Sequence, residues 1–174
     1  MMPTMPALAS SISQRSAKSK AMNQIAPLLS ADRIHLDVLV DSKRQLFDWL
    51  GETAARETGL EARQISASLL AREKLGSTAL GQQVAIPHGR IKRLKTAFGL
   101  LVRLAEPVEF DAPDGLSVGL MFVLLVPVQA TDLHLQILGE LAQVLGDAGL
   151  RQKIIQATDA QLVMQLLTDW QPWG

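Results

Sequence analysis

The longest apolar stretch of this 174-residue chain runs from Val118 to Val128 and is interrupted only by Gly119 and Pro127. A short apolar run bounded by turn residues is typical of a buried strand, and we expect this one to lie at the centre of a sheet. A membrane span needs about 20 consecutive apolar residues, so the run is too short to cross a bilayer. The stretch therefore favours a sheet-containing domain and predicts no membrane insertion.

Strand and helix patterns alternate on both sides of this run. Asp41 and Ser42 offer a helix N-cap, Gly59 a helix stop, and the segment from Asp111 to Gly115 a turn. Apolar periodicity predicts strands over 33–40, around Leu80, and over 84–86, 96–104 and 116–126, and helices over 43–56, 61–74, 133–145, 150–157 and 159–170. We therefore expect an α/β fold: a single layered domain with a mixed β-sheet flanked by α-helices.

Composition excludes several function classes. The chain is 48% hydrophobic, which suffices for a core, and its 17 basic residues balance its 17 acidic ones. A neutral chain offers no concentrated basic face, so we expect no nucleic-acid partner. The absence of cysteine removes disulfides, thiolate chemistry and cysteine-ligated zinc.

The first residues differ in character from the rest. The segment from Met1 to Lys20 is rich in serine and alanine, has no acidic residue, and lacks the continuous apolar core of a secretory signal. Its low hydrophobicity predicts disorder. We expect a disordered N-terminal tail over 1–22 and one domain over 23–174, with Met22 as an alternative start.

One short motif carries the candidate chemistry. His88 follows the apolar run 84–86 and Pro87, and precedes Gly89. Proline cannot donate to a sheet ladder, so we expect the strand to end at Pro87 and to leave His88 at a strand end. A histidine held there suits three roles: nucleophile, general base or metal ligand.

A longer signature surrounds that histidine. The segment from Arg72 to Gly89 resembles the active-site signature of enzyme IIA of the phosphoenolpyruvate-dependent phosphotransferase system, mannitol/fructose class, and the run Arg-Glu-x-x-Gly-Ser-Thr resembles its nitrogen-regulatory type. The resemblance covers about residue 26 to the C-terminus. The matching residues are Glu73, Leu80, Gly81, Val84, Ala85, Ile86, Pro87, His88 and Gly89.

The resemblance implies a phosphotransferase with named site residues. His88 is the phosphoryl acceptor, His134 orients its ring or binds the phosphoryl group, and Arg72 offers a guanidinium to phosphate oxygens. Ser77 and Thr78 are candidates for further hydrogen bonds to phosphate. His134 also lies in the first turn of a predicted helix, where anions are favoured and an imidazolium is not.

Two of the histidines could also serve as metal ligands. A zinc site at His88 and His134 would need a third ligand, and we expect neither metal nor cofactor. His35, inside a predicted strand, fits a structural role.

The main interpretation is a cytoplasmic nitrogen-regulatory enzyme IIA that takes phosphate from an HPr-type phosphocarrier protein and regulates target proteins. Two competing interpretations are a relay of phosphate to a mannitol- or fructose-type transporter and a binding module without turnover. The sequence does not indicate the oligomeric state.

Overall fold

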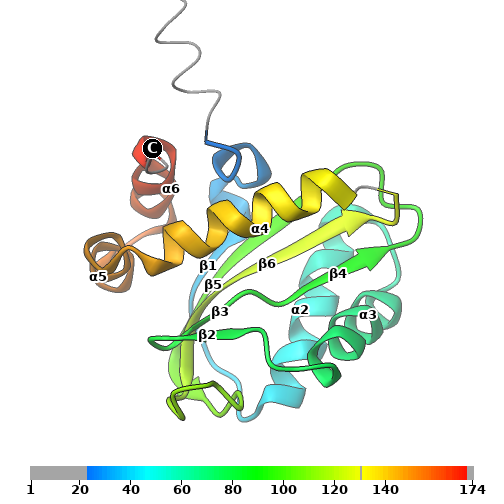
Figure 1. Cartoon of the computed structure of the whole chain (residues 1–174), viewed down its shortest axis with the longest axis horizontal. Helices are drawn as coiled ribbons and strands as arrows, with labels where there is room; N and C mark the ends of the chain where they lie inside the picture. Colours follow the sequence, from blue (N-terminus) through cyan, green and yellow to red (C-terminus); the bar gives the residue numbers. More distant parts are fainter. Residues whose placement is uncertain (1–22, 130, 172–174) are drawn as a thin grey trace, which may run out of the picture.

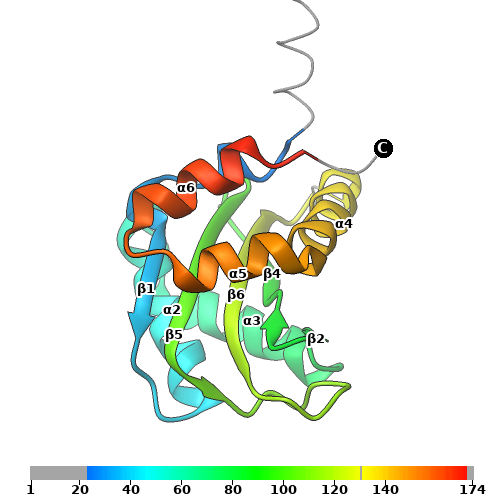
Figure 2. The ribbon, with the colours of Figure 1, turned by 90° about the vertical axis from the view of Figure 1, so that its left-hand side faces the viewer.

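The computed structural model describes residues 23–129 and 131–171, without the side chain of Thr131. The disordered tail predicted for residues 1–22 therefore lies outside the described residues. A mixed six-stranded sheet forms the middle layer, and helices cover both of its faces (Figures 1 and 2). The predicted α/β fold, a mixed sheet flanked by helices, is confirmed.

The two helical layers are separate groups. One face of the sheet carries α2 (Lys43–Thr58) and α3 (Ala62–Lys74), and the opposite face carries α4 (Thr131–Gly146), α5 (Ala148–Gln156) and α6 (Ala160–Asp169). Two short 3₁₀ helices, η1 (Ala26–Leu28) and η2 (Ala31–Arg33), precede the first strand. Within the described residues, no helix combines the length and the apolar character that a membrane crossing requires.

The sheet is organised around its most apolar strand. The strands are β1 (Ile34–Val38), β2 (Ala79–Gly81), β3 (Val84–Ala85), β4 (His88–Ile91), β5 (Phe98–Val108) and β6 (Val118–Pro127). Their order is β1-β5-β6-β3-β2, and β4 also pairs with β6. The central position predicted for the run 118–128 is thus confirmed, because β6 pairs with three strands.

The side chains of β6 alternate between the two cores. Leu120, Phe122, Leu124 and Val126 pack under α4, α5 and α6. Met121, Val123 and Leu125 pack toward α2 and α3. A strand covered on both faces can be apolar at every position, which explains why its sequence shows no alternation.

The predicted helix ends are mostly confirmed. The Ser42 hydroxyl accepts a hydrogen bond from the Gln45 amide at 3.1 Å, and Gly59 ends α2 with a left-handed φ of 75°. Asp159 caps α6 by accepting from the Leu162 amide at 2.8 Å. Helix α4 begins at Thr131, two residues earlier than predicted; the Thr131 part of the expected cap lies outside the described side chains.

The position of His88 corrects the prediction of a strand end. Strand β3 does end before Pro87, but the chain continues along β6, and His88 begins β4. Proline lacks only the donor: its carbonyl still accepts from the Leu124 amide at 2.9 Å. Strands β3 and β4 therefore follow one path along β6, interrupted at Ile86 and Pro87.

Candidate functional site

The ring of His88 is held by its own local backbone. Its Nδ1 lies 2.8 Å from the carbonyl oxygen of Ile86, two residues earlier. A carbonyl only accepts, so we assign the hydrogen of the neutral ring to Nδ1. The Nε2 lone pair is then left available as a nucleophile. Ile86 and Pro87 lie between β3 and β4, so the contact forms where the chain passes from one strand to the next.

The His88 ring is kept neutral near pH 7. Burial lowers its pKa below the usual 6.5, the hydrogen bond to Ile86 opposes that change, and the charge of Arg72 lowers the pKa further. A neutral imidazole needs no separate base to act as a nucleophile.

His134, in the first turn of α4, lies against that ring. The two ring centroids are 5.3 Å apart and the planes meet at 68°. Its Nδ1 is buried and has no hydrogen-bond partner among the described residues, so Nε2 is the nitrogen that can serve a ligand. Burial, followed by the charges of His88 and Arg90, lowers the pKa of His134 as well.

A pocket of about 380 Å³ opens beside the two histidines. Arg72, in the last turn of α3, lines one wall, and its Nη1 donates to the Gly76 carbonyl at 2.8 Å. Arg90 of β4 lines another part. Leu75, with 85% of its surface exposed, borders the opening. The structure thus brings Arg72, His88 and His134 together around one cavity.

Residues 27–170 match the family model described as "Phosphoenolpyruvate-dependent sugar phosphotransferase system, EIIA 2". The chain belongs to this EIIA 2 family. A nitrogen regulatory protein of Bradyrhizobium diazoefficiens is 40% identical over 82% of the chain and 94% of its own length, and one of Pseudomonas aeruginosa is 37% identical over 86% and 98%. The crystal structure of nitrogen regulatory protein IIA-Ntr from Neisseria meningitidis matches with a TM-score of 0.79, at 45% identity over 82% of the chain and 98% of that structure. The resemblance to the nitrogen-regulatory type is confirmed.

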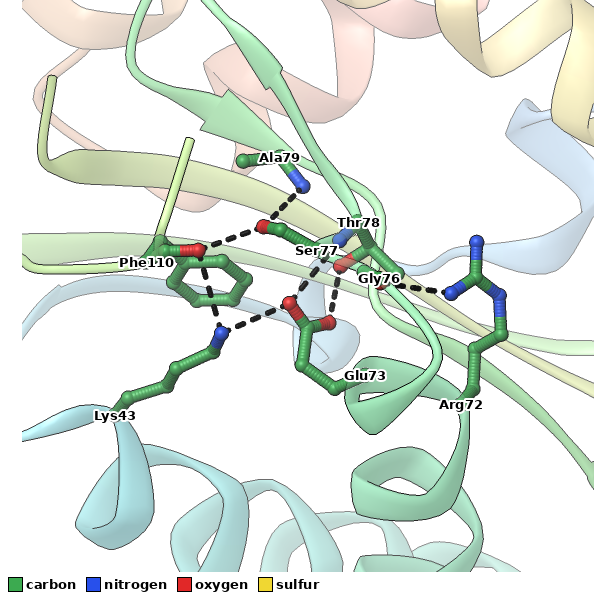
Figure 3. Close-up of polar contacts among 8 residues, drawn as sticks. All are labelled: Lys43, Arg72, Glu73, Gly76, Ser77, Thr78, Ala79 and Phe110. Carbon is green, nitrogen blue, oxygen red and sulfur yellow. Dashed lines mark hydrogen bonds and ion pairs between the residues drawn. The ribbon is translucent and has the colours of Figure 1, made fainter. Parts of the chain in front are cut away.

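Two predicted residues of this EIIA domain lie elsewhere. Ser77 and Thr78 do not line the pocket, and Figure 3 shows the contacts that they make instead. The Thr78 hydroxyl donates to Glu73 Oε1 at 2.6 Å and its amide donates to Oε2 at 3.0 Å. The Ser77 hydroxyl donates to the Phe110 carbonyl at 2.6 Å and accepts from the Ala79 amide at 3.1 Å. Phosphate binding by Ser77 and Thr78 therefore stays a prediction, and their hydroxyls are engaged in the fold.

The hydrogen bonds of Thr78 belong to a buried polar network. Glu73, whose side chain is 5% exposed, also pairs with Lys43 Nζ of α2 at 2.9 Å. These contacts close the loop between α3 and β2, in which Gly76 offers its carbonyl to Arg72 (Figure 3). The network thus stabilises the loop whose Gly76 carbonyl binds the guanidinium of Arg72.

Arg90 is a pocket residue that the sequence pattern did not single out. It stands two positions after His88 on β4, and side chains two apart share a face of a strand. The i, i+2 spacing of His88 and Arg90 can be read from the sequence, but a strand predicted to end at Pro87 does not include either residue. Once β4 is known to begin at His88, the i, i+2 relation places Arg90 beside the histidine.

Metal binding at the two histidines finds no support in the geometry. The described residues contain no group of three His, Cys, Asp or Glu side chains that could hold a metal. A zinc ion at His88 and His134 would therefore lack a third protein ligand there. The remaining histidine, His35, packs edge-on against Trp49, with centroids 5.3 Å apart, and does not line the pocket.

Proposed function

We propose that this protein accepts a phosphoryl group on Nε2 of His88 from the phosphohistidine of an HPr-type carrier, and that its phosphorylation state regulates target proteins. The observation that carries the proposal is the contact between His88 Nδ1 and the Ile86 carbonyl. It fixes the ring so that one nitrogen holds the hydrogen and the other holds the reactive lone pair.

The proposed step balances without a moving proton. The Nε2 lone pair of His88 forms a bond to phosphorus as the bond between phosphorus and the carrier's ring nitrogen breaks. The electron pair of the broken bond returns to the carrier's imidazole, and each ring keeps the hydrogen on its other nitrogen. Positive charge therefore grows on the His88 ring, where the Ile86 carbonyl stabilises it through Nδ1–H.

The neighbouring residues stabilise the transferring group. Phosphoryl transfer places charge on three equatorial oxygens and depends on positioning and electrostatics. Arg72 lines the same pocket as His88, so its guanidinium is placed to act on a phosphoryl group there. His134 presents its accessible Nε2 to the same space, and as the N–H tautomer it donates to a phosphoryl oxygen.

The regulatory part of the proposal is supported by the relatives. Proteins named nitrogen regulatory protein match nearly along their full lengths. We place the exchange with the carrier in the cytoplasm.

The test uses labelled phosphoenolpyruvate, purified enzyme I and carrier protein. Wild-type protein should gain an acid-labile, alkali-stable label, as a phosphoramidate does, and His88→Ala should gain none. His35→Asn, the matched control, removes a histidine outside the pocket and should label normally. Labelling of His88→Ala at the wild-type rate would refute the proposal. Rapid loss of the label to a sugar-specific enzyme IIB would favour the transport relay.

A further inference from the structure

Arg90 forms two hydrogen bonds with other segments, one through its backbone to α3 and one through its side chain to Val128. The Ser68 hydroxyl of α3 donates to the Arg90 carbonyl at 3.0 Å. Gly89 makes this approach possible, because a Cβ built at that position would lie 2.5 Å from the same hydroxyl oxygen. The strand therefore packs directly on the helix that carries Arg72.

The side chain of Arg90 binds the segment that follows β6. Its Nη1 donates to the carbonyl of Val128 at 3.2 Å, just beyond the end of β6. Val128 belongs to the connection that leads into α4 and lies six residues before His134. One residue thus links α3, through its backbone carbonyl, to the segment directly after β6, through its guanidinium.

The charge of Arg90 also acts on the second histidine. It lowers the pKa of His134, whereas the arginine that lowers the pKa of His88 is Arg72. A cation beside His134 favours its neutral form, in which Nε2–H donates and the buried Nδ1 carries no hydrogen.

We propose that Arg90 is a positioning residue of this site, which holds the segment after β6 against β4 and so keeps His134 in place beside His88. The inference rests on the proposed function, because it assigns Arg90 a part in the same transfer. Arg90 acts through His134 and not on the phosphoryl group itself.

The first test is a double-mutant cycle between Arg90→Gln and His134→Ala, read as the initial rate of phosphoryl transfer from the carrier to His88. Residues that act through one another give non-additive effects. Arg90→Gln should slow transfer about tenfold, the size of a lost hydrogen bond. It should have little further effect once His134 is alanine. The half-saturating carrier concentration should change little.

Arg63→Gln is the matched control, because Arg63 is an exposed arginine of α3 that does not line the pocket. It should transfer at the wild-type rate. Equal slowing by Arg90→Gln in the His134→Ala background would overturn the proposal, because Arg90 would then act independently of His134.

A second measurement needs no phosphoryl transfer. Imidazole titration by nuclear magnetic resonance should show the His134 midpoint raised in Arg90→Gln and retained in Arg90→Lys, and contacts between the rings of His134 and His88 should weaken in Arg90→Gln. The charged or titratable groups around the ring of His134 are His88 and Arg90 from β4 and Arg72 from α3, while Asp132 of α4 is exposed. If wild type accepts no phosphate, the proposed function fails. An unchanged titration and unchanged ring contacts in Arg90→Gln would still overturn the positioning role by themselves.

Discussion

Replacing Thr78 by valine separates its structural role from the phosphate-binding role that the sequence suggests. The substitution keeps the shape of the side chain and removes the hydroxyl that donates to Glu73 Oε1 at 2.6 Å. That oxygen belongs to a buried carboxylate, while the other oxygen retains Lys43 and the Thr78 amide. A hydrogen bond to a charged group contributes about 1.5–3 kcal/mol. Because the ion pair remains, we expect the free energy of unfolding to fall by about 2 kcal/mol.

Urea unfolding followed by tryptophan fluorescence measures this loss, and the melting temperature should fall by about 4–8 °C. Thr168→Val is the matched control, since the Thr168 hydroxyl donates to the Met164 carbonyl on an exposed helix face. Its effect should stay within about 0.5 kcal/mol. Phosphoryl acceptance by Thr78→Val should change far less than the roughly 100-fold expected when a preorganised contact to the reacting group is lost. Normal stability with acceptance lowered about 100-fold would refute the placement of Thr78 in the Glu73 network.

Three further predictions concern the pocket. Phosphoryl acceptance should decline only below the usual imidazole midpoint of 6.5, because burial lowers the pKa of His88 and its neutral form survives to lower pH; a rate profile with a midpoint above 6.5 would contradict this. Gly89→Ala should lower the free energy of unfolding by about 1–2 kcal/mol through its clash with the Ser68 hydroxyl, and Ser68→Ala should recover part of the loss; additive losses in urea unfolding would refute the contact. Arg72→Ala and His134→Ala should each slow labelling of His88 by about 100- to 1,000-fold without abolishing it, and wild-type rates in both variants would show that neither stabilises the transfer.

Much of the fold follows from local signals. The run 118–128 indicated the central strand because only a strand covered on both faces tolerates apolar residues throughout. Ser42, Gly59 and Asp159 marked helix ends, since capping is a matter of neighbouring atoms. The family signature pointed to His88, His134 and Arg72, which the structure brings to one pocket.

The remainder depends on contacts between distant segments. The path of β4 past Pro87 relies on a hydrogen bond from Leu124, which the local sequence does not encode. Ser77 lies within the signature, but its hydroxyl is engaged by the carbonyl of Phe110, 33 residues later. The Thr78 hydroxyl is engaged by Glu73 of the same signature, a carboxylate that the packing of the domain buries. The sequence around Thr78 does not show that the carboxylate of Glu73 is buried and accepts its hydrogen bond.

The most direct test of the account is the position of phosphorus on the ring of His88. Protein labelled with ¹⁵N in histidine and phosphorylated by the carrier should show phosphorus–nitrogen coupling to Nε2. Its Nδ1 should carry a hydrogen bonded to the Ile86 carbonyl, as the 2.8 Å contact requires. Coupling to Nδ1, or to the ring of another histidine, would contradict the account, because the nitrogen assigned the lone pair would then not be the nucleophile.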